Sequence, residues 1–352
     1  MELEKIRGAI DTIDYEIVKL LSRRLEHALR LKRLKGSIVE PEREQQVIEH
    51  VRGCSHTVVA PEFTERLYRA IIEESIRVQK KDLRLIGFQG EHGAYSEVAA
   101  LGYDESLVPI PCAGFDEVFN QVETRQLDYA IVPVENSLEG PVTEVNDLLI
   151  ETGLQVVGER SISVHHCLLA LPGADYRELR TVYSHPQALG QCRASISRHK
   201  LEARPFYDTA GAAIMLREQR PAGCAVLASR LCADLYDLEV LHEHMEDSDS
   251  NLTRFLVLSR EAERVEGNKC SVVFSVAHRP GGLFAVLKVL SDAAINMTRI
   301  ESRPHRLDPG SYAFFVDFEG SDGDEGVKAA LDGIREGCTS FKFLGCYRGH
   351  KG

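Results

Sequence analysis

Residues 251–259 place a hydroxyl and a guanidinium, those of Thr253 and Arg254, at the start of an apolar run typical of a buried strand. A threonine hydroxyl can donate a proton and an arginine can hold a carboxylate in a planar fork, so the pair suits a small anionic substrate that loses an oxygen. Taken alone, the stretch is more typical of a strand that begins with two ordinary solvated residues. The rest of the chain must decide between these interpretations.

A second arginine stands where a charge is costly. Near the amino terminus, apolar residues recur three and four apart, which indicates a heptad seam on one long helix. These residues are Leu3, Ile6, Ile10, Ile13, Ile17, Leu20, Leu31 and Leu34. Continuing the count places Arg24 and His27 in the seam, where a lone charge needs a ligand or a partner to neutralise it. Arg24 is therefore a candidate anion receptor.

The long helix also predicts self-association. About thirty helical residues make a rod of roughly 45 Å, longer than an eighty-residue domain covers by folding back on itself. We therefore expect an all-α domain in an intertwined homodimer or a higher homo-oligomer. Further helices are predicted near 43–51 and over 61–81. The polar residues that could converge with Arg24 on one pocket are Lys35, Arg43, Glu44, Ser75 and Gln79; the alternative is that they are surface charges.

This segment resembles the all-α chorismate mutases throughout, in residues 6–14, 23–24, 35, 41–44 and 71–79. The resemblance implies that Arg24, and Arg7 of the partner subunit, grip the two carboxylates of chorismate. It implies that Lys35 and Gln79 address the ether oxygen. Supporting contacts are implied for Glu40, Arg43, Glu44 and Ser75. The reaction is a pericyclic rearrangement, so it needs a compressed substrate conformer and positive charge at the breaking C–O bond, and no general base.

Residues 83 to about 260 alternate between strand and helix patterns, which predicts two α/β lobes around a cleft. The predicted strands are 83–88, 128–134, 163–171, 181–183, 204–207, 224–227 and 254–258. A Gly-rich turn before Ser96 offers backbone N–H groups to an anion, and Ser184 is placed to cap a second helix. Asn136 ends a strand at the edge where open α/β sheets bind ligands. His92 and His185 are more typical of structural histidines, and we assign them no chemistry.

The motifs at 90–96, 133–137, 183–187, 208–210 and 252–255 resemble the prephenate dehydratases, with departures at Gln89 and Ala94. The resemblance implies a two-lobed domain like periplasmic binding proteins, and conversion of prephenate to phenylpyruvate with loss of carbon dioxide and the ring hydroxyl. It implies Thr253 as the acid, acting late in bond breaking or in a relay polarised by Arg254 or Asn136. The candidate contacts to substrate are Ser96, Asn136, Ser184, Gln187, Gln191, Thr209 and Arg254.

A new series of predicted strands and helices begins after a polar linker at 260–268. The order of the following elements is βαββαβ, with strands at 270–277, 297–302, 312–318 and 341–347, which predicts a ferredoxin-like unit. Residues 280–287 and 301–304 resemble the phenylalanine-binding ACT module. Gly282 stands where that module usually has Ala. The implied regulatory residues are Gly281, Gly282, Leu283, Glu301, Ser302, Arg303 and Pro304; the alternative is a structural cap.

The chain of 352 residues has room for these domains, which we place at 1–82, 83–262 and 268–348. A net charge of −12, from 54 acidic and 42 basic residues, disfavours nucleic acid as a partner. Nine scattered cysteines without a Cys-x-x-Cys suggest neither a disulfide framework nor a zinc site. No run is long and apolar enough for a membrane span. We expect a cytoplasmic protein without metal or organic cofactor.

Together, the resemblances imply a bifunctional enzyme of phenylalanine biosynthesis, with chorismate and prephenate as substrates and L-phenylalanine as a feedback effector. Two alternatives remain open at this point. The first is a dehydratase whose helical segment only dimerises, and the second is a non-catalytic amino-acid sensor. Following chorismate, prephenate and phenylpyruvate separately would distinguish them.

Overall fold

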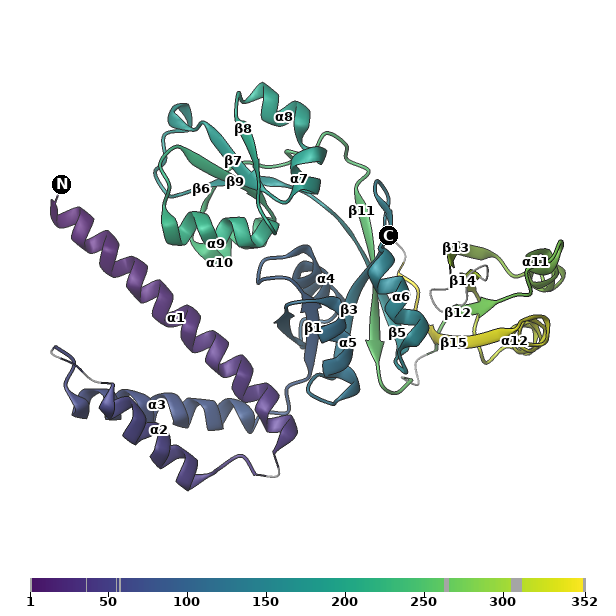
Figure 1. Ribbon diagram of the computed structural model, residues 1–352, viewed down its shortest axis with the longest axis horizontal. Helices are drawn as coiled ribbons and strands as arrows, with labels where there is room; N and C mark the ends of the chain where they lie inside the picture. The colour runs from purple at the N-terminus through teal and green to yellow at the C-terminus, as the bar shows by residue number, and fades with distance from the viewer. Residues whose placement is uncertain are drawn as a thin grey trace. The chain divides into compact units, whose positions relative to one another are not determined.

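The computed structural model describes residues 2–35, 37–54, 56, 58–262, 266–304 and 312–350. The chain forms two compact units, the first consisting of residues 1–85 with 124–127 and the second of the remainder. Figure 1 labels their elements. Among the described residues, no helix is long and apolar enough to cross a membrane.

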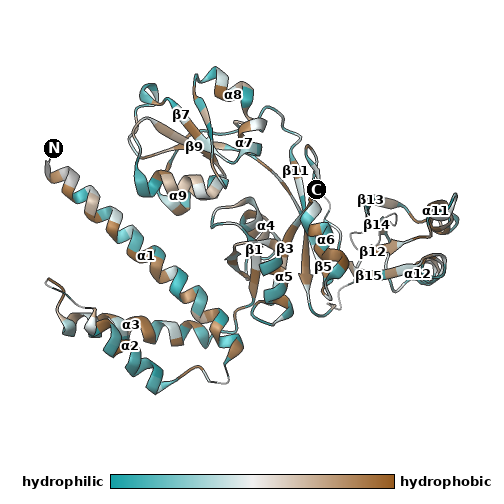
Figure 2. Ribbon diagram, in the orientation of Figure 1, coloured by the Kyte–Doolittle hydropathy of each residue, from teal (hydrophilic) through white to brown (hydrophobic). Residues whose placement is uncertain are grey.

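The first unit is all-α, as predicted. Its helices are α1 (Glu2–Leu34), α2 (Pro41–Gly53) and α3 (Pro61–Gln79). Prolines begin α2 and α3, where their missing N–H costs no intrahelical hydrogen bond. The predicted seam of α1 is largely exposed in the single chain, with 48–59% exposure for Leu3, Ile6, Ile10, Ile13 and Ile17, and α1 alternates between apolar and polar residues along its length (Figure 2).

The second unit begins with a mixed sheet in the order β2-β1-β3-β11-β5, with β4 paired to β3. Its strands are β1 (Leu85–Gln89), β2 (Val108–Cys112), β3 (Tyr129–Asn136), β4 (Gly140–Pro141), β5 (Gln155–Ser163) and β11 (Leu252–Ser259). Helices α4 (Tyr95–Tyr103), α5 (Phe115–Glu123) and α6 (Thr143–Glu151) belong to this lobe. The central strand β11 runs antiparallel to both β3 and β5.

The second lobe is built between β5 and β11 in the sequence. Its sheet has the order β10-β6-β9-β7-β8. The strands are β6 (Cys167–Ala170), β7 (Thr181–Ser184), β8 (Glu202–Pro205), β9 (Cys224–Ala228) and β10 (Glu239–His242), and the helices are η1 (Tyr176–Glu178), α7 (Pro186–Gln191), α8 (Arg193–Arg198), α9 (Thr209–Gln219) and α10 (Arg230–Tyr236). The chain therefore passes between the lobes twice, through residues 164–166 and 243–251, which we call the two crossovers.

The crossovers lie side by side. The N–H of Val164 donates to the carbonyl of Asn251 at 2.8 Å, and the N–H of Met245 donates to the carbonyl of His166 at 2.9 Å. The sequence-based strand over 163–171 is wrong at this point, because Ser163 ends β5 in one lobe and Cys167 begins β6 in the other. A continuous run of strand-forming residues conceals the short crossover between them.

The carboxyl-terminal sheet has the order β13-β14-β12-β15. Its strands are β12 (Lys269–Ser275), β13 (Met297–Pro304), β14 (Tyr312–Glu319) and β15 (Ser340–Tyr347), and its helices are α11 (Gly282–Asp292) and α12 (Glu325–Gly337). The two helices and the sheet share one apolar core that includes Val286, Val316 and Ile334. The predicted βαββαβ order is confirmed.

Candidate active sites

The helical unit brings three of the predicted polar residues to the contact between α1 and α3. Nη1 of Arg24 donates to Oγ of Ser75 at 2.5 Å, and that hydroxyl donates to the carbonyl of Ile71 at 2.8 Å. Nε2 of Gln79 donates to the carbonyl of Ala28 at 3.0 Å. Ser75 and Gln79 are buried, and both side chains bond α1, Ser75 at Arg24 and Gln79 at Ala28.

The other predicted residues of this unit form a less closed arrangement. Nζ of Lys35 lies 2.8 Å from Oε2 of Glu40 in a half-exposed ion pair. Oε1 of Glu44 is buried and has no hydrogen-bond partner in the described chain, so it is an unsatisfied hydrogen-bond acceptor. Arg43 is exposed and donates to Gln46 at 3.3 Å, which places it outside this group.

Arg7 lies too far along α1 to join Arg24 within one chain. The two residues are seventeen positions apart on one helix, which corresponds to roughly 25 Å. A cavity of about 300 Å³ lies between α2 and α3, lined by Pro41, Glu44, Gln45, Ile48, Arg69, Ile72, Glu73 and Ile76. It shares Glu44 with the predicted site but not Arg24, Ser75 or Gln79. This cavity therefore does not enclose the predicted residues, and Arg7 stands apart from them along α1.

The two-lobed part centres on Thr253 and Asn136, which face each other because β11 and β3 pair in that register. Oδ1 of Asn136 accepts the N–H groups of Leu138 and Glu139, each at 3.0 Å, which fixes the orientation of its amide. Nδ2 then donates to Oγ1 of Thr253 at 2.8 Å and to Oδ1 of Asn251 at 2.7 Å. Within the described residues, the Thr253 hydroxyl accepts this hydrogen bond and donates none, so its proton is available.

The hydrogen bonds continue from this pair into the second lobe. Nδ2 of Asn251 donates to Oε1 of Gln191 at 3.0 Å, and Nε2 of His166 donates to the same oxygen at 3.0 Å. The Tyr95 hydroxyl lies 2.7 Å from Nδ1 of His166. Burial lowers the pKa of His166 and raises the pKa of Tyr95 well above its usual value, so both are neutral near pH 7.

Asn251, His166 and Tyr95 received no role from the sequence. A signal existed for Asn251, because it stands two positions before Thr253 and alternate residues of an extended segment share a face. His166 had no such signal, since it lies in a crossover that the sequence pattern concealed.

Arg254 points away from this cluster. Its guanidinium bonds Glu159 at 2.7 Å, Asp317 at 2.5 Å and the Tyr347 hydroxyl at 3.0 Å. Burial alone would lower the pKa of Arg254, but Asp317, Tyr347 and Glu159 raise it above its usual value. The structure thus places Arg254 between β5 and the carboxyl-terminal module, and does not bring its guanidinium to Thr253 as the prediction of a substrate contact required.

Several other predicted contacts are already engaged. The Ser184 hydroxyl is fully buried and donates to the carbonyl of Leu227 at 2.6 Å, so it does not cap the helix. His185 is the cap instead, accepting the N–H of Gln187 at 3.3 Å, while the Gln187 side chain is exposed. The predicted cap at Ser184 is therefore wrong, while its contact with substrate and that of Gln187 stay predictions.

The Gly-rich turn keeps its predicted shape, with positive φ at Gly90 and Gly93. Its N–H groups are not all free for an anion, since the N–H of Gly93 donates to the buried Glu97 carboxylate at 2.5 Å. Ser96 and Thr209 are buried near the starts of α4 and α9, positions that still offer a hydroxyl close to a helix amino terminus.

In the carboxyl-terminal module, Gly281 takes a left-handed conformation immediately before α11. A cavity of about 130 Å³ beside it is lined by Val276, Ala277, His278, Arg279, Leu283, Tyr312 and Phe314. A Cβ on Gly282 would lie 2.7 Å from the carbonyl oxygen of Ala277, so glycine is required by the backbone here. Arg303 faces elsewhere and contacts Asp147 at 3.5 Å on α6; the segment Glu301–Pro304 lies on β13 and does not line this cavity within one chain.

Comparison with known proteins assigns these parts. Family models match for chorismate mutase type II at residues 6–80, prephenate dehydratase at 86–263 and the ACT domain at 271–336. A bifunctional chorismate mutase/prephenate dehydratase from Neisseria gonorrhoeae is 35% identical over 347 residues, which cover 97% of this chain and 95% of the relative. The chain belongs to this bifunctional family.

Two further relatives support the membership of this bifunctional mutase–dehydratase. A bifunctional chorismate mutase/prephenate dehydratase from Aquifex aeolicus is 34% identical over 358 residues, covering 98% of each chain. The crystal structure of a prephenate dehydratase from Arthrobacter aurescens in complex with L-Phe has a TM-score of 0.69 and 30% identity, and covers 75% of this chain and 89% of that one. The multidomain fold and the bifunctional enzyme expected from the sequence are therefore confirmed, while the boundaries at 82, 262 and 268 stay predictions.

Proposed function

We propose that Thr253 is the proton donor with which this mutase–dehydratase converts prephenate to phenylpyruvate. The observation that supports this role is the hydrogen bond from the fixed Asn136 amide to Oγ1, which leaves the hydroxyl proton free to be donated. As the ring carboxylate leaves as carbon dioxide, its electron pair enters the ring and expels the ring hydroxyl. That hydroxyl takes the proton from Thr253 and departs as water, and Thr253 then regains a proton from solvent.

Asn136 is the group that makes this step possible for so weak an acid. A threonine alkoxide is costly, so the proton moves late, when the departing oxygen already carries negative charge. The Nδ2 hydrogen of Asn136 stabilises the negative charge that develops on Oγ1. Asn136, rather than Arg254, is therefore the polarising group, because the Arg254 guanidinium is bonded to Glu159 and Asp317.

For the rearrangement of chorismate to prephenate, we propose that Arg24 binds a carboxylate and that Lys35 and Gln79 donate to the ether oxygen. Ser75 orients Arg24 through the hydrogen bond at 2.5 Å, and Glu44, with its unpartnered oxygen, accepts from Gln79 or substrate once the site is complete. These groups place positive charge at the breaking C–O bond.

Completion requires a second chain in this proposal. Arg7 is roughly 25 Å from Arg24 along α1, and apolar residues of α1 are exposed between them. Pairing the α1 seams of two chains buries those residues and brings Arg7 of the partner subunit to the site of the first. A homodimer is therefore the smallest active mutase.

The regulatory proposal places L-phenylalanine in the terminal module, near Leu283. The cavity there is lined by apolar residues such as Leu283 and Phe314 and by polar residues such as Arg279, and a related prephenate dehydratase carries L-Phe. Binding at an interface between two terminal modules would favour one conformation of the dehydratase through differential affinity. If saturating L-phenylalanine left the dehydratase rate unchanged, this proposal would be wrong.

We also propose a cytoplasmic location, because all nine cysteines are free thiols and reduced thiols are typical of that compartment.

The experiment that tests these roles supplies purified protein with chorismate, then separately with prephenate, and follows both substrates and phenylpyruvate. A Thr253→Ala chain should convert chorismate and accumulate prephenate. An Arg24→Ala chain should leave chorismate intact and still consume added prephenate. Normal dehydration by Thr253→Ala would refute the assignment of the acid.

A further inference from the structure

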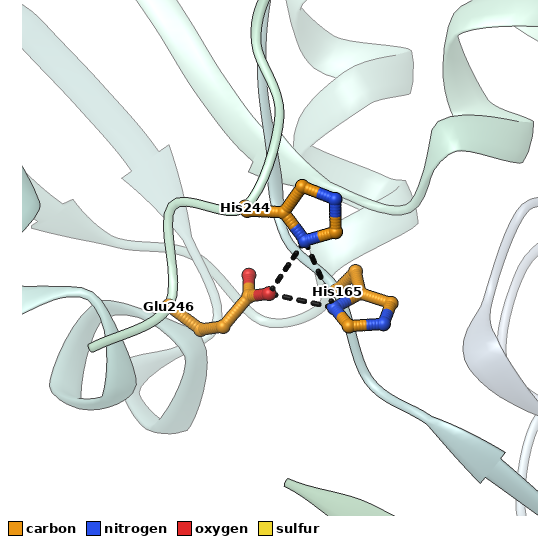
Figure 3. Close-up of side chains that lie close together, drawn as sticks. All are labelled: His165, His244 and Glu246. Carbon is orange, nitrogen blue, oxygen red and sulfur yellow. Dashed lines mark hydrogen bonds and ion pairs between the residues drawn. The ribbon is translucent and has the colours of Figure 1, made fainter. Parts of the chain in front are cut away.

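Three side chains converge where the two crossovers meet (Figure 3). His165 comes from the first crossover, and His244 and Glu246 come from the second. Nδ1 of His165 lies 2.7 Å from Oε1 of Glu246, Nδ1 of His244 lies 3.3 Å from the same oxygen, and the two Nδ1 atoms are 3.2 Å apart. None of these residues takes part in the proposed dehydration.

The separations fit the edges of a small coordination polyhedron. Zinc binds histidine nitrogen and carboxylate oxygen at about 2.0–2.2 Å, so neighbouring ligands of a tetrahedral ion lie roughly 3.3–3.5 Å apart. Two of the three observed edges, 3.2 and 3.3 Å, are close to that length, and the third is a hydrogen bond that lengthens when the metal replaces its proton. Two imidazoles and a carboxylate are a donor set that Zn²⁺ prefers.

The carboxylate is already oriented for this role. Its side chain is 1% exposed, and Oε2 accepts the backbone N–H of His166 at 2.8 Å, which aims Oε1 at the histidines. Such an anchoring hydrogen bond is typical of metal ligands. The side chains of His165 and His244 are 44% and 61% exposed, which gives an ion a route of entry and a side for a water ligand.

His244 supplies an independent sign of function. Its backbone has φ of +55°, a left-handed conformation that non-glycine residues rarely adopt. In this conformation the ring centroid of His244 lies 4.6 Å from that of His165. Residues held in such conformations cluster at functional sites, where the surroundings stabilise them.

We propose that His165, His244 and Glu246 form a binding site for a divalent transition-metal ion, with Zn²⁺ the best fit, that clips the two crossovers together. Any motion of one lobe relative to the other must pass through the two crossovers, and an ion with ligands on both would add to the backbone hydrogen bonds that already join them. The ion would therefore act as a brake on motion between the lobes.

A short chain of hydrogen bonds also links the proposed metal site to Thr253. Glu246 holds the N–H of His166, whose ring bonds Gln191, and Gln191 bonds Asn251 beside Thr253. Fixing Glu246 on a metal fixes the crossover that carries His166. We therefore expect a metal response in the dehydratase reaction and none in the mutase reaction, whose residues lie in the helical unit.

Binding is tested first, without reference to activity. Metal-free full-length protein is titrated with Co²⁺, whose visible absorption reports tetrahedral nitrogen and oxygen ligands, and the bound Co²⁺ is then displaced with Zn²⁺. The expected result is one equivalent bound without a thiolate charge-transfer band, which distinguishes the site from the nine cysteines. His244→Ala and His165→Ala should each weaken binding by at least about tenfold, since even loss of a supporting contact costs 10–100-fold.

His242→Ala is the matched control. His242 stacks on His199 with ring centroids 4.6 Å apart, forming a second histidine pair that is not part of this cluster. Its removal should leave Co²⁺ binding unchanged. Equal binding by the wild type and the His244→Ala chain, or no binding by the wild type, would overturn the site.

The role of the ion is tested in the same preparations. Zn²⁺ added at saturation should change the rate of prephenate consumption in the wild type and the His242→Ala chain, but not in the His244→Ala chain. Chorismate consumption should stay the same throughout. An unchanged prephenate rate in a chain that binds the ion would refute the brake while leaving both the metal site and the assignment of Thr253 intact.

Discussion

The polar residues of the helical domain and those of the dehydratase domain are held in different ways. Around Thr253, side chains from both lobes and both crossovers bond one another, and Asn136, Asn251 and Thr253 are at most 9% exposed. Around Arg24, contacts come from two helices of one chain, and apolar residues of α1 remain about half exposed. Folding of a single chain completes and buries the polar group around Thr253. Around Arg24, it leaves the apolar face of α1 exposed to solvent.

This contrast indicates how one chain can carry two reactions without their interfering. The dehydratase cluster depends on the register of β11 against β3, which intramolecular folding fixes. The proposed mutase site depends on a second copy of the chain and so on protein concentration. Variants that damage one site should therefore leave the other at full rate, and the following predictions test that independence.

The largest effect is expected for Thr253→Ala. Loss of a positioned general acid should slow dehydration by roughly 10²–10⁴-fold, while chorismate consumption is unchanged. Thr253→Ser, which keeps the hydroxyl, should retain much more activity than Thr253→Ala. A parallel fall in both activities would contradict the independence of the sites.

A smaller effect is expected for Arg24→Ala in the mutase reaction. Removing one charge-stabilising donor should lower the rate by about 10²–10³-fold, measured as the disappearance of chorismate. Arg43→Ala serves as a control, because its exposed guanidinium donates to Gln46. If the two variants lost activity equally, the position of Arg24 beside Ser75 would have no catalytic meaning.

The dimer prediction concerns Ile13, which is 54% exposed on α1. Ile13→Glu removes an apolar side chain from both halves of the proposed seam, at about 1.5 kcal/mol or more per chain, so the dimer should weaken by about 10²-fold. Sedimentation at decreasing concentration measures this, and mutase activity should fall with the dimer while dehydratase activity persists. Val58→Glu is the control, because Val58 is 91% exposed outside the seam.

The smallest effect is on stability and comes from His166. Burial lowers the pKa of His166, so below about pH 6.5 the unfolded chain binds a proton that the folded chain does not. The stability of the dehydratase domain should therefore fall as pH decreases through that value, by at most about 1.4 kcal/mol per pH unit. Denaturant unfolding at pH 7.5 and 5.5 measures it, and His166→Gln should remove this component of the slope.

The sequence predicts candidate site residues where a reactive side chain stands at the terminus of a strand with a clear local pattern. Thr253 stands at the start of β11 and Asn136 at the end of β3, so local pattern alone picks out both as candidate site residues. The alternation of β11 also contained a signal that the prediction did not use, since consecutive residues of a strand face opposite ways. Arg254 could not share the face of Thr253.

The remaining features depend on contacts that no local pattern encodes. His165 and Glu246 are 81 positions apart, and the partners of Arg254 in the ACT module include Asp317, 63 positions away. Such pairs form only when segments far apart in the sequence come together. The capping role predicted for Ser184 was wrong for a related reason, because its acceptor, the carbonyl of Leu227, lies on the neighbouring strand β9.

The opposed directions of Thr253 and Arg254 restrict how β11 can change over time. A deletion or insertion within the strand would exchange its two faces beyond that point, turning a charged side chain toward the face that carries Thr253 and breaking the ion pairs with the terminal module. The flanking crossover is also held in place, because Asn251 bonds Asn136 and Met245 bonds the carbonyl of His166, so it does not absorb such length changes. Descendants of this chain should therefore vary β11 by substitution alone, with its length inherited unaltered.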